Sequence, residues 1–166
     1  SILFLDSVLV ISLLSLLHLR NDTASSFVLL IWVIILTVFS DIGGYFFGKI
    51  FKWKKFTYIS PNKTLSGVFG SLFLSLISII FLGLTLEIFF NADFNSIFKI
   101  KYFILAILFS LSAQIGDLIV SYFKRLEKIK DTGKILPGHG GIFDRIDGLM
   151  FSVIVANICY YLKLFP

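Results

Sequence analysis

Five long runs of apolar residues divide this chain, and short polar segments separate them. The runs cover roughly residues 1–19, 25–47, 66–90, 101–123 and 148–165. A helix needs about 20 apolar residues to cross the hydrocarbon of a bilayer, and it satisfies its backbone hydrogen bonds internally. The pattern therefore predicts an all-α, polytopic transmembrane helical bundle of about five spans, with residues 1–166 in a single transmembrane domain.

The composition agrees with a protein that has lipid as its solvent. Hydrophobic residues make up 57% of the chain and charged residues 15%, and the mean hydropathy is +0.95. Soluble domains carry about a quarter charged residues. The single cysteine, Cys159, excludes a disulfide within the chain. Because the chain begins with Ser1 rather than Met, we expect it to be a fragment or a trimmed chain that lacks N-terminal segments.

The basic residues predict how the bundle is oriented. Eleven of the fifteen lysines and arginines lie in the loops that follow the second and fourth runs, so both loops fall on one side of the membrane. The positive-inside rule assigns that side to the cytoplasm. The net charge of +5 is therefore explained by membrane topology, and we do not expect a nucleic-acid partner. The basic residues concerned are Lys49, Lys52, Lys54, Lys55, Lys63, Lys124, Arg125, Lys128, Lys130, Lys134 and Arg145.

Two aspartates, Asp41 and Asp117, interrupt the apolar runs. A carboxylate at membrane depth costs several kcal/mol and marks a candidate functional site, although it can also simply pair with a lysine or serine of a neighbouring helix. Asp117 belongs to a polar stripe at steps of four and three residues, which follow one helical face. The stripe consists of Ser110, Gln114, Asp117, Ser121 and Lys124. Gly43 and Gly44 are expected to loosen or break the second helix just after Asp41.

The two basic loops carry motifs suited to phosphate. In ISPNKTLSG, short polar side chains surround Lys63, a single cation in a tight turn. In KDTGKILPGHGGIFDRID, the glycines leave backbone amides open to an anion. Asp144 and Asp147 are three residues apart and would share a helical face. Neighbouring carboxylates repel unless a cation separates them, and oxygen ligands favour Mg²⁺. An ordinary helix start explains one of these aspartates well and two passably.

The combination indicates phosphate chemistry at a membrane surface. The chain has no G-x-x-x-x-G-K-[ST] motif and no G-x-G-x-x-G motif, which argues against P-loop and dinucleotide-binding folds. Cations and glycine amides would hold a polyphosphate, and carboxylates would hold Mg²⁺, which neutralises developing charge on phosphoryl oxygens.

The stretch SYFKRLEKIKDTGKILPGHGGIFDRID, residues 121–147, resembles the signature of the phosphatidate cytidylyltransferases, also called CDP-diacylglycerol synthases. DIGGYFFGK and ISPNKTLSG resemble earlier blocks of that family in the same order. The resemblance implies that the chain is the C-terminal catalytic part of the family fold, without its first spans. It also implies transfer of a cytidylyl group from CTP to phosphatidic acid, which gives CDP-diacylglycerol and pyrophosphate in the bacterial inner membrane.

The resemblance further implies roles for individual residues. The implied metal ligands for Mg²⁺ are Asp117, Asp144 and Asp147, with Asp41 as a further acidic candidate, and a monovalent cation such as K⁺ is also implied. The implied catalytic residues are Asp117, Lys124, Arg125, His139, Asp144 and Asp147. The implied substrate-binding residues are Ser60, Asn62, Lys63, Ser121, Lys130, Asp131, Gly140, Gly141 and Arg145. The family also allows a homodimer.

Two departures from the family and two alternative functions remain open. Family members commonly have Asp-Thr-Gly-Ala-Tyr where this chain has Asp-Ile-Gly-Gly-Tyr at residues 41–45, and a glutamate where this chain has Ser66, which removes a carboxylate. The GHGG and DRxD elements are partly shared with CTP-dependent polyprenol kinases and with cytidylyltransferases for other lipids. An ion-coupled transporter that uses Asp41 and Asp117 is a third interpretation, but it would not require the long cytoplasmic insert.

Overall fold

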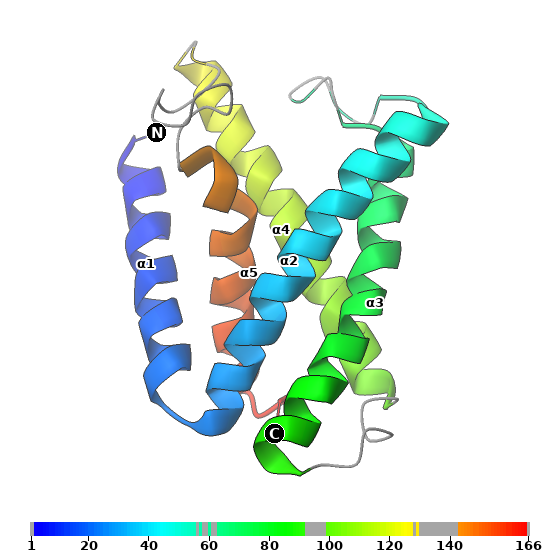
Figure 1. The fold of residues 1–166 in the computed structure, drawn as a ribbon. Coiled ribbons are helices and arrows are strands. Elements are labelled where there is room, and N and C mark those ends of the chain that lie inside the picture. The colour runs from blue at the N-terminus through cyan, green and yellow to red at the C-terminus, as the bar shows by residue number, and fades with distance from the viewer. Residues whose placement is uncertain are drawn as a thin grey trace.

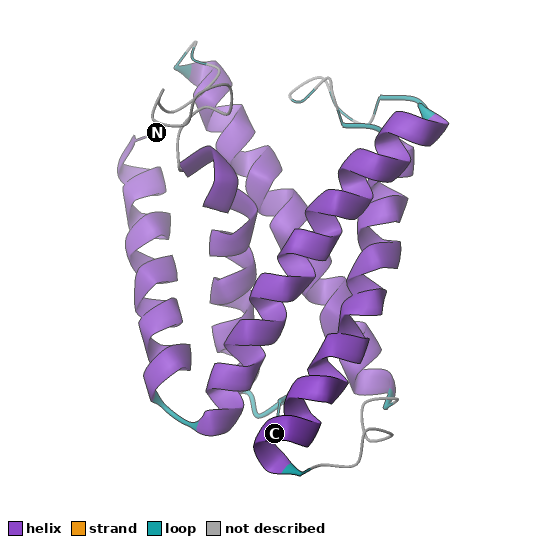
Figure 2. Cartoon of the chain, in the orientation of Figure 1, coloured by secondary structure: helices purple, strands orange, loops and turns teal. Residues whose placement is uncertain are grey.

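The computed structural model describes residues 2–55, 57, 60, 63–91, 99–127, 129 and 143–165, with the side chains of Ile2, Asp144 and Arg145 outside that description. These residues form five helices joined by loops (Figures 1 and 2). The helices are α1 (Ile2–Asn21), α2 (Ala24–Phe51), α3 (Leu65–Phe90), α4 (Ile100–Leu126) and α5 (Phe143–Tyr161). The predicted all-α bundle is confirmed.

Four of the five helices, α1 to α4, are long and apolar enough to cross a membrane. The fifth helix is shorter, and its apolar part runs over Ile146–Tyr161. It begins five residues before the predicted start at 148 and ends four residues before the predicted end at 165. The earlier start follows from the FDRID segment, whose polar residues form the first turn of α5 instead of a loop before it.

The ends of the helices are sorted as the basic loops predict. The C-terminal ends of α2 and α4 lie at the same end of the bundle as the N-terminal ends of α3 and α5 (Figure 1). The turn between α1 and α2 and the C-terminus lie at the opposite end. Both basic connections are therefore on one side, and we call this the loop end of the bundle.

The core is built around Trp32 of α2, which is 1% exposed. Its ring packs at 5.6 Å, centroid to centroid, against Phe109 of α4, and its indole nitrogen donates to the Ser78 hydroxyl of α3 at 3.1 Å. Large apolar side chains such as Phe69 and Ile88 point outwards and remain exposed. Apolar side chains on the outer surface and hydrogen-bonded polar groups in the interior are typical of a bundle whose outer surface faces lipid.

The prediction that Gly43 and Gly44 break α2 is wrong, because the helix continues without interruption to Phe51. The two glycines instead allow α3 to approach closely. A Cβ atom at Gly44 would lie only 2.8 Å from the Ser71 hydroxyl oxygen, and one at Gly43 would overlap the backbone of Gly70. Small residues allow this kind of backbone approach between membrane helices. The α2–α3 pair is consequently the most closely packed in the bundle.

Candidate functional site

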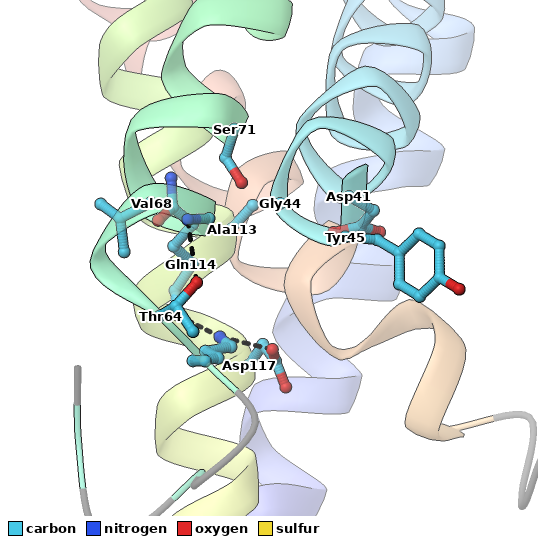
Figure 3. Close-up of a pocket in the computed structure, with 11 residues that line it drawn as sticks. Asp41, Gly44, Tyr45, Thr64, Val68, Ser71, Ala113, Gln114 and Asp117 are labelled. Atoms are coloured by element: carbon cyan, nitrogen blue, oxygen red, sulfur yellow. Dashed lines mark hydrogen bonds and ion pairs between the residues drawn. The ribbon is translucent and has the colours of Figure 1, made fainter. Parts of the chain in front are cut away.

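A cavity of about 220 Å³ opens between α2, α3 and α4 towards the loop end. Its lining is mostly small or polar, in contrast to the apolar exterior of the helices (Figure 3). The lining residues are Asp41, Gly44 and Tyr45 of α2, Lys63 and Thr64 before α3, Gly67, Val68 and Ser71 of α3, and Ala113, Gln114 and Asp117 of α4.

The connection between α2 and α3 holds Lys63 at this cavity. The Leu65 amide donates to the Lys54 carbonyl oxygen at 3.1 Å, and Lys55 forms an isolated antiparallel bridge with Thr64, which closes the base of the loop. The Thr64 hydroxyl then caps α3 by accepting from the Gly67 amide at 3.2 Å. The backbone around Lys63 is therefore fixed on its C-terminal side by a helix start.

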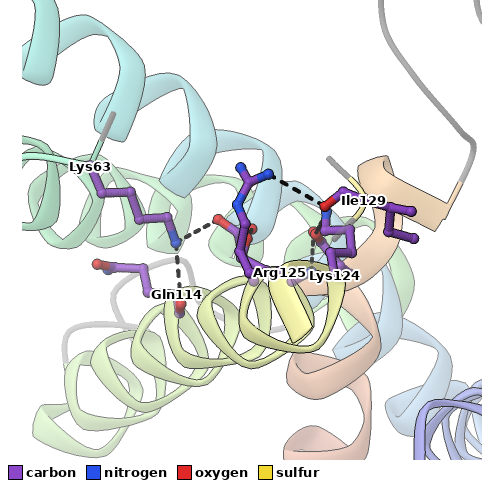
Figure 4. A network of polar contacts seen from close by, with 9 residues as sticks. Lys63, Gln114, Lys124, Arg125 and Ile129 are labelled. Atoms are coloured by element: carbon purple, nitrogen blue, oxygen red, sulfur yellow. Dashed lines mark hydrogen bonds and ion pairs between the residues drawn. The ribbon is translucent and has the colours of Figure 1, made fainter. Parts of the chain in front are cut away.

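The side chain of Lys63 reaches across to α4. Its amino group lies 2.5 Å from a carboxylate oxygen of Asp117 and donates to the backbone carbonyl oxygen of Gln114 at 3.3 Å (Figure 4). The Ser121 hydroxyl donates to the other carboxylate oxygen of Asp117 at 3.3 Å. The polar stripe predicted on the fourth span is thus confirmed, and it faces the cation of the first loop.

A second pair of charges lies beside Asp117, where α4 meets α5. The amino group of Lys124 is 3.9 Å from a carboxylate oxygen of Asp147, and each side chain is 10% exposed. The other Asp147 oxygen accepts from the Gly148 amide at 2.8 Å. Asp147 also interacts electrostatically with Asp117. Two carboxylates and two lysines therefore gather in one place, and each lysine neutralises one carboxylate.

Close contact between α4 and α5 brings the two carboxylates together. Gly116, next to Asp117, is buried against Phe151 of α5, and Gly148, next to Asp147, is packed against the backbone of Ala113. A Cβ atom at Gly116 would overlap Phe151, and one at Gly148 would lie 3.1 Å from the Ala113 carbonyl oxygen, which is a tight contact. The glycines flanking the aspartates therefore determine how closely Asp117 and Asp147 can approach each other.

This arrangement suits a hard cation such as Mg²⁺. Two neighbouring carboxylates supply the oxygen ligands that Mg²⁺ prefers, and Mg²⁺ commonly binds one or two carboxylates together with substrate phosphates. Among the described residues, no group of three or more His, Cys, Asp or Glu side chains could hold a metal ion. Asp41, which lines the cavity on α2, is therefore not gathered with Asp117 and Asp147 into one such group. The Mg²⁺ site stays a prediction.

The other predicted site residues are distributed as follows. Arg125 is exposed, and its guanidinium donates to the Ile129 carbonyl oxygen at 3.4 Å, beyond the end of α4 (Figure 4). Ser60 accepts from the Lys63 amide at 3.0 Å within the first loop. Asp144 and Arg145 belong to the first turn of α5. Asn62, Lys130, Asp131, His139, Gly140 and Gly141 lie outside the described residues, so their predicted roles stay predictions.

Several lining residues were not singled out by the sequence pattern. Tyr45 and Ser71 stand at the cavity, and Ser40 of α2 shares a buried 2.9 Å hydrogen bond with Ser110 of α4 beneath it. The signal that could have revealed them is the recurrence of Gly and Ser at spacings of three and four in the second and third spans, since such residues line contacts between membrane helices.

Ser66, where the family resemblance leads us to expect a glutamate, is 3% exposed and is not among the residues that line the cavity. Its hydroxyl shares a 3.0 Å hydrogen bond with the Thr64 hydroxyl at the start of α3. Ser66 therefore contributes to the cap of this helix instead of adding a carboxylate to the cavity.

Comparison with known proteins identifies the family. The chain belongs to the cytidylyltransferase family, whose model matches residues 1–163. It is 44% identical over 131 residues to a phosphatidate cytidylyltransferase of Staphylococcus aureus (strain COL), which covers 78% of this chain and 45% of that protein. It is 38% identical over 139 residues to a phosphatidate cytidylyltransferase of Helicobacter pylori (strain J99), which covers 81% of this chain and 47% of that protein. The chain spans about half the length of the curated relatives it matches.

Proposed function

We propose that this chain carries the catalytic site of an enzyme that transfers the cytidylyl group of CTP to phosphatidic acid. The observation that carries the proposal is the gathering of Lys63, Asp117, Lys124 and Asp147, from three separate segments, beside a polar cavity at the loop end. Family membership and the names of the relatives point to the same chemistry. Nucleotidyl transfer needs mainly positioning and charge stabilisation, which such a site can supply.

The proposed reaction is an in-line displacement at phosphorus. A phosphate oxygen of phosphatidic acid attacks the α-phosphorus of CTP. The bond from that phosphorus to the oxygen bridging the α- and β-phosphates breaks, and pyrophosphate leaves with the bonding electrons. The products are CDP-diacylglycerol and pyrophosphate. Both substrates are anionic, so the first requirement of the site is to bring them together against their mutual repulsion.

Lys63 and Lys124 meet that requirement in this proposal. A lysine amino group carries three donors on a flexible stem. Each lysine can keep contact with its carboxylate, Asp117 or Asp147, while it donates to a phosphate oxygen. The burial of Lys124 excludes water and strengthens this interaction. Ser121 fixes the orientation of Asp117 by hydrogen bonding, and Gly116 and Gly148 fix its distance from Asp147.

Asp117 and Asp147 are the proposed carboxylate ligands for Mg²⁺, with Asp144 as a third candidate from the first turn of α5. Bound there, Mg²⁺ would neutralise developing negative charge on the phosphoryl oxygens. A monovalent cation such as K⁺, expected from the family resemblance, is part of the same proposal.

The position of the site fits two substrates that arrive from different phases. We place the loop end on the cytoplasmic face of the bacterial inner membrane, because both basic connections are there. CTP would enter from the aqueous side. Phosphatidic acid would approach within the bilayer, with its headgroup at the charged end of the helices and its acyl chains in lipid. Assembly as a homodimer is compatible with this arrangement.

A labelling experiment separates the proposed function from its nearest alternative. Purified protein in detergent is supplied with phosphatidic acid, Mg²⁺ and CTP labelled at the α-phosphate. The proposal predicts that the label moves into lipid and that one pyrophosphate is released for each lipid labelled. A lipid kinase of related sequence would release labelled CDP and leave the lipid unlabelled, and that result would refute the proposed function. An ion-coupled transporter would consume no CTP.

A further inference from the structure

The α2 wall of the cavity lies apart from the cluster of Lys63, Asp117, Lys124 and Asp147, and it carries different side chains. Asp41 and Tyr45 are one helical turn apart on this wall, and both are exposed. Figure 3 shows Asp41 apart from Asp117, on the other side of the cavity, with Gly44 on the side of α2 that faces Ser71 of α3. Lys63 pairs with Asp117. The cavity therefore has Lys63 and Asp117 at one end, and the carboxylate of Asp41 comes from a separate helix at another.

We infer that this cavity is the base-recognition pocket for cytosine, with Asp41 as its specificity-determining residue. The inference rests on the proposed use of CTP and extends it from the phosphates to the base. In this arrangement the triphosphate lies at Lys63, Asp117, Lys124 and Asp147, and the base extends towards Asp41 in the cavity between α2, α3 and α4.

The lining of the cavity matches the edge of cytosine. The exocyclic amino group of cytosine is a hydrogen-bond donor, and carboxylates accept from it in other nucleic-acid complexes. Asp41 supplies that acceptor. The ring nitrogen and carbonyl oxygen of the base are acceptors, and the Ser71 hydroxyl and the Gln114 amide supply donors on the facing walls. An ionised carboxylate would instead repel the carbonyl oxygen that uracil carries in place of the amino group.

The size of the cavity also suits a pyrimidine base. Its volume is about 220 Å³. Gly44, Gly67 and Ser71 pack against one another where α2 meets α3, and they close the cavity on that side without bulky side chains. At the rim, the Tyr45 ring is 70% exposed and carries the Lys49 amino group 5.5 Å from its centroid. An exposed aromatic ring at a pocket mouth can stack against a base.

Equilibrium binding of labelled CTP, in competition with unlabelled CTP and UTP, tests this inference on the purified full-length protein. The wild type is expected to prefer CTP. Asp41→Asn replaces an acceptor by an amide that can also donate to the uracil carbonyl, so the CTP-to-UTP preference should fall about 10- to 100-fold. Asp41→Ala should weaken CTP binding and relieve the repulsion of UTP, but it adds no donor for the uracil carbonyl, so UTP should gain less affinity than in Asp41→Asn. Asp22→Asn, the same change at the opposite end of the bundle, should leave the preference unchanged.

Ser71→Ala provides a second variant that does not alter a charge. It removes only the hydroxyl from the pocket without adding bulk at the α2–α3 contact, and CTP affinity should fall about 10-fold. The inference is overturned if the Asp41 variants and Ser71→Ala keep the wild-type affinities. It is equally overturned if Asp41→Asn weakens CTP and UTP alike and shifts only the Mg²⁺ requirement, or if it changes only the KM for phosphatidic acid.

The binding assay separates the failure of this inference from the failure of the proposed function. It requires no turnover. A wild type that transfers label from CTP to lipid but shows an unaltered base preference in Asp41→Asn would retain the proposed function and lose only the base pocket. A wild type that binds no CTP would contradict both.

Discussion

Replacement of Gly116 by alanine is expected to separate Asp117 from Asp147 without removing any functional group. A Cβ atom at Gly116 would lie 2.5 Å from Cδ2, 2.6 Å from Cγ and 2.7 Å from Cβ of Phe151. Ordinary contact begins at 3.4 Å, so the shortest contact falls short by nearly 1 Å. Because Cβ and Cγ of Phe151 are held close to the α5 backbone, a rotation of the ring cannot relieve the clash and the two helices must move apart.

The expected magnitudes follow from that displacement. Overpacking of a filled interface costs about 1–3 kcal/mol, which should appear as a lower thermal midpoint of the purified protein. Displacement of catalytic groups by about 1 Å can cost about 100-fold in rate. We therefore expect turnover of CTP with phosphatidic acid to fall about 10- to 100-fold at saturating substrates, while the protein remains inserted and folded.

Paired variants test the steric explanation. Phe151→Ala in the Gly116→Ala background removes the ring atoms responsible for the two shortest contacts, and part of the lost turnover should return. Phe151→Ala alone should lower the thermal midpoint and leave turnover nearly unchanged, because it creates a cavity without pushing the helices apart. Wild-type turnover in Gly116→Ala, or a double variant no better than Gly116→Ala, would refute the claim that this contact sets the spacing of the carboxylates.

Three further substitutions distinguish a residue that binds substrate from residues that only stabilise the fold. Lys63→Met should lower kcat/KM for CTP about 10- to 100-fold, since it removes a charged donor, and Lys63→Arg should recover part of the loss; unchanged kinetics would remove Lys63 from the phosphate site. Ser66→Ala should cost about 0.5–1.5 kcal/mol of stability and little turnover, because its hydroxyl bonds Thr64 at the helix start; a large fall in kcat would contradict this. Tyr160→Phe removes a 2.6 Å bond to Asp22 at the opposite end and should lower the thermal midpoint but not kcat, both measured on the same preparation.

The spans could be predicted from the sequence because lipid imposes a simple rule. A run of apolar residues with the length of the hydrocarbon must form a helix, and this rule predicted all five helices. The same rule gave a poor start for α5. Asp144 and Asp147 are polar, so hydropathy places the start of the apolar run at 148, although their spacing indicates a helical face and both belong to the start of α5. Polar residues at a membrane surface do not interrupt a helix whose backbone remains hydrogen-bonded.

The site could be predicted only where one helix determines it. The stripe from Ser110 to Lys124 follows from the period of a single helix, and it is confirmed. The pairing of Lys63 with Asp117 depends on how a loop folds over a neighbouring helix, which the period of one helix does not encode. Contacts with a neighbouring helix also explain why the predicted break at Gly43 and Gly44 is absent. Their low helix propensity suggested a break, but close packing of α3 against them outweighs it.

The most direct test of the central claim compares the same substitution at two aspartates, one in the proposed centre and one at the opposite end of the bundle (Figure 1). Asp147→Asn and Asp22→Asn are made in the same full-length protein, and transfer of α-labelled CTP to phosphatidic acid is measured in equal amounts of folded, membrane-extracted protein. Asp147→Asn should lose about 100- to 1,000-fold in kcat, because a charged group at the reacting phosphates is removed, and Asp22→Asn should match the wild type. Near-normal transfer by Asp147→Asn would contradict the claim that Lys63, Asp117, Lys124 and Asp147 form the catalytic centre.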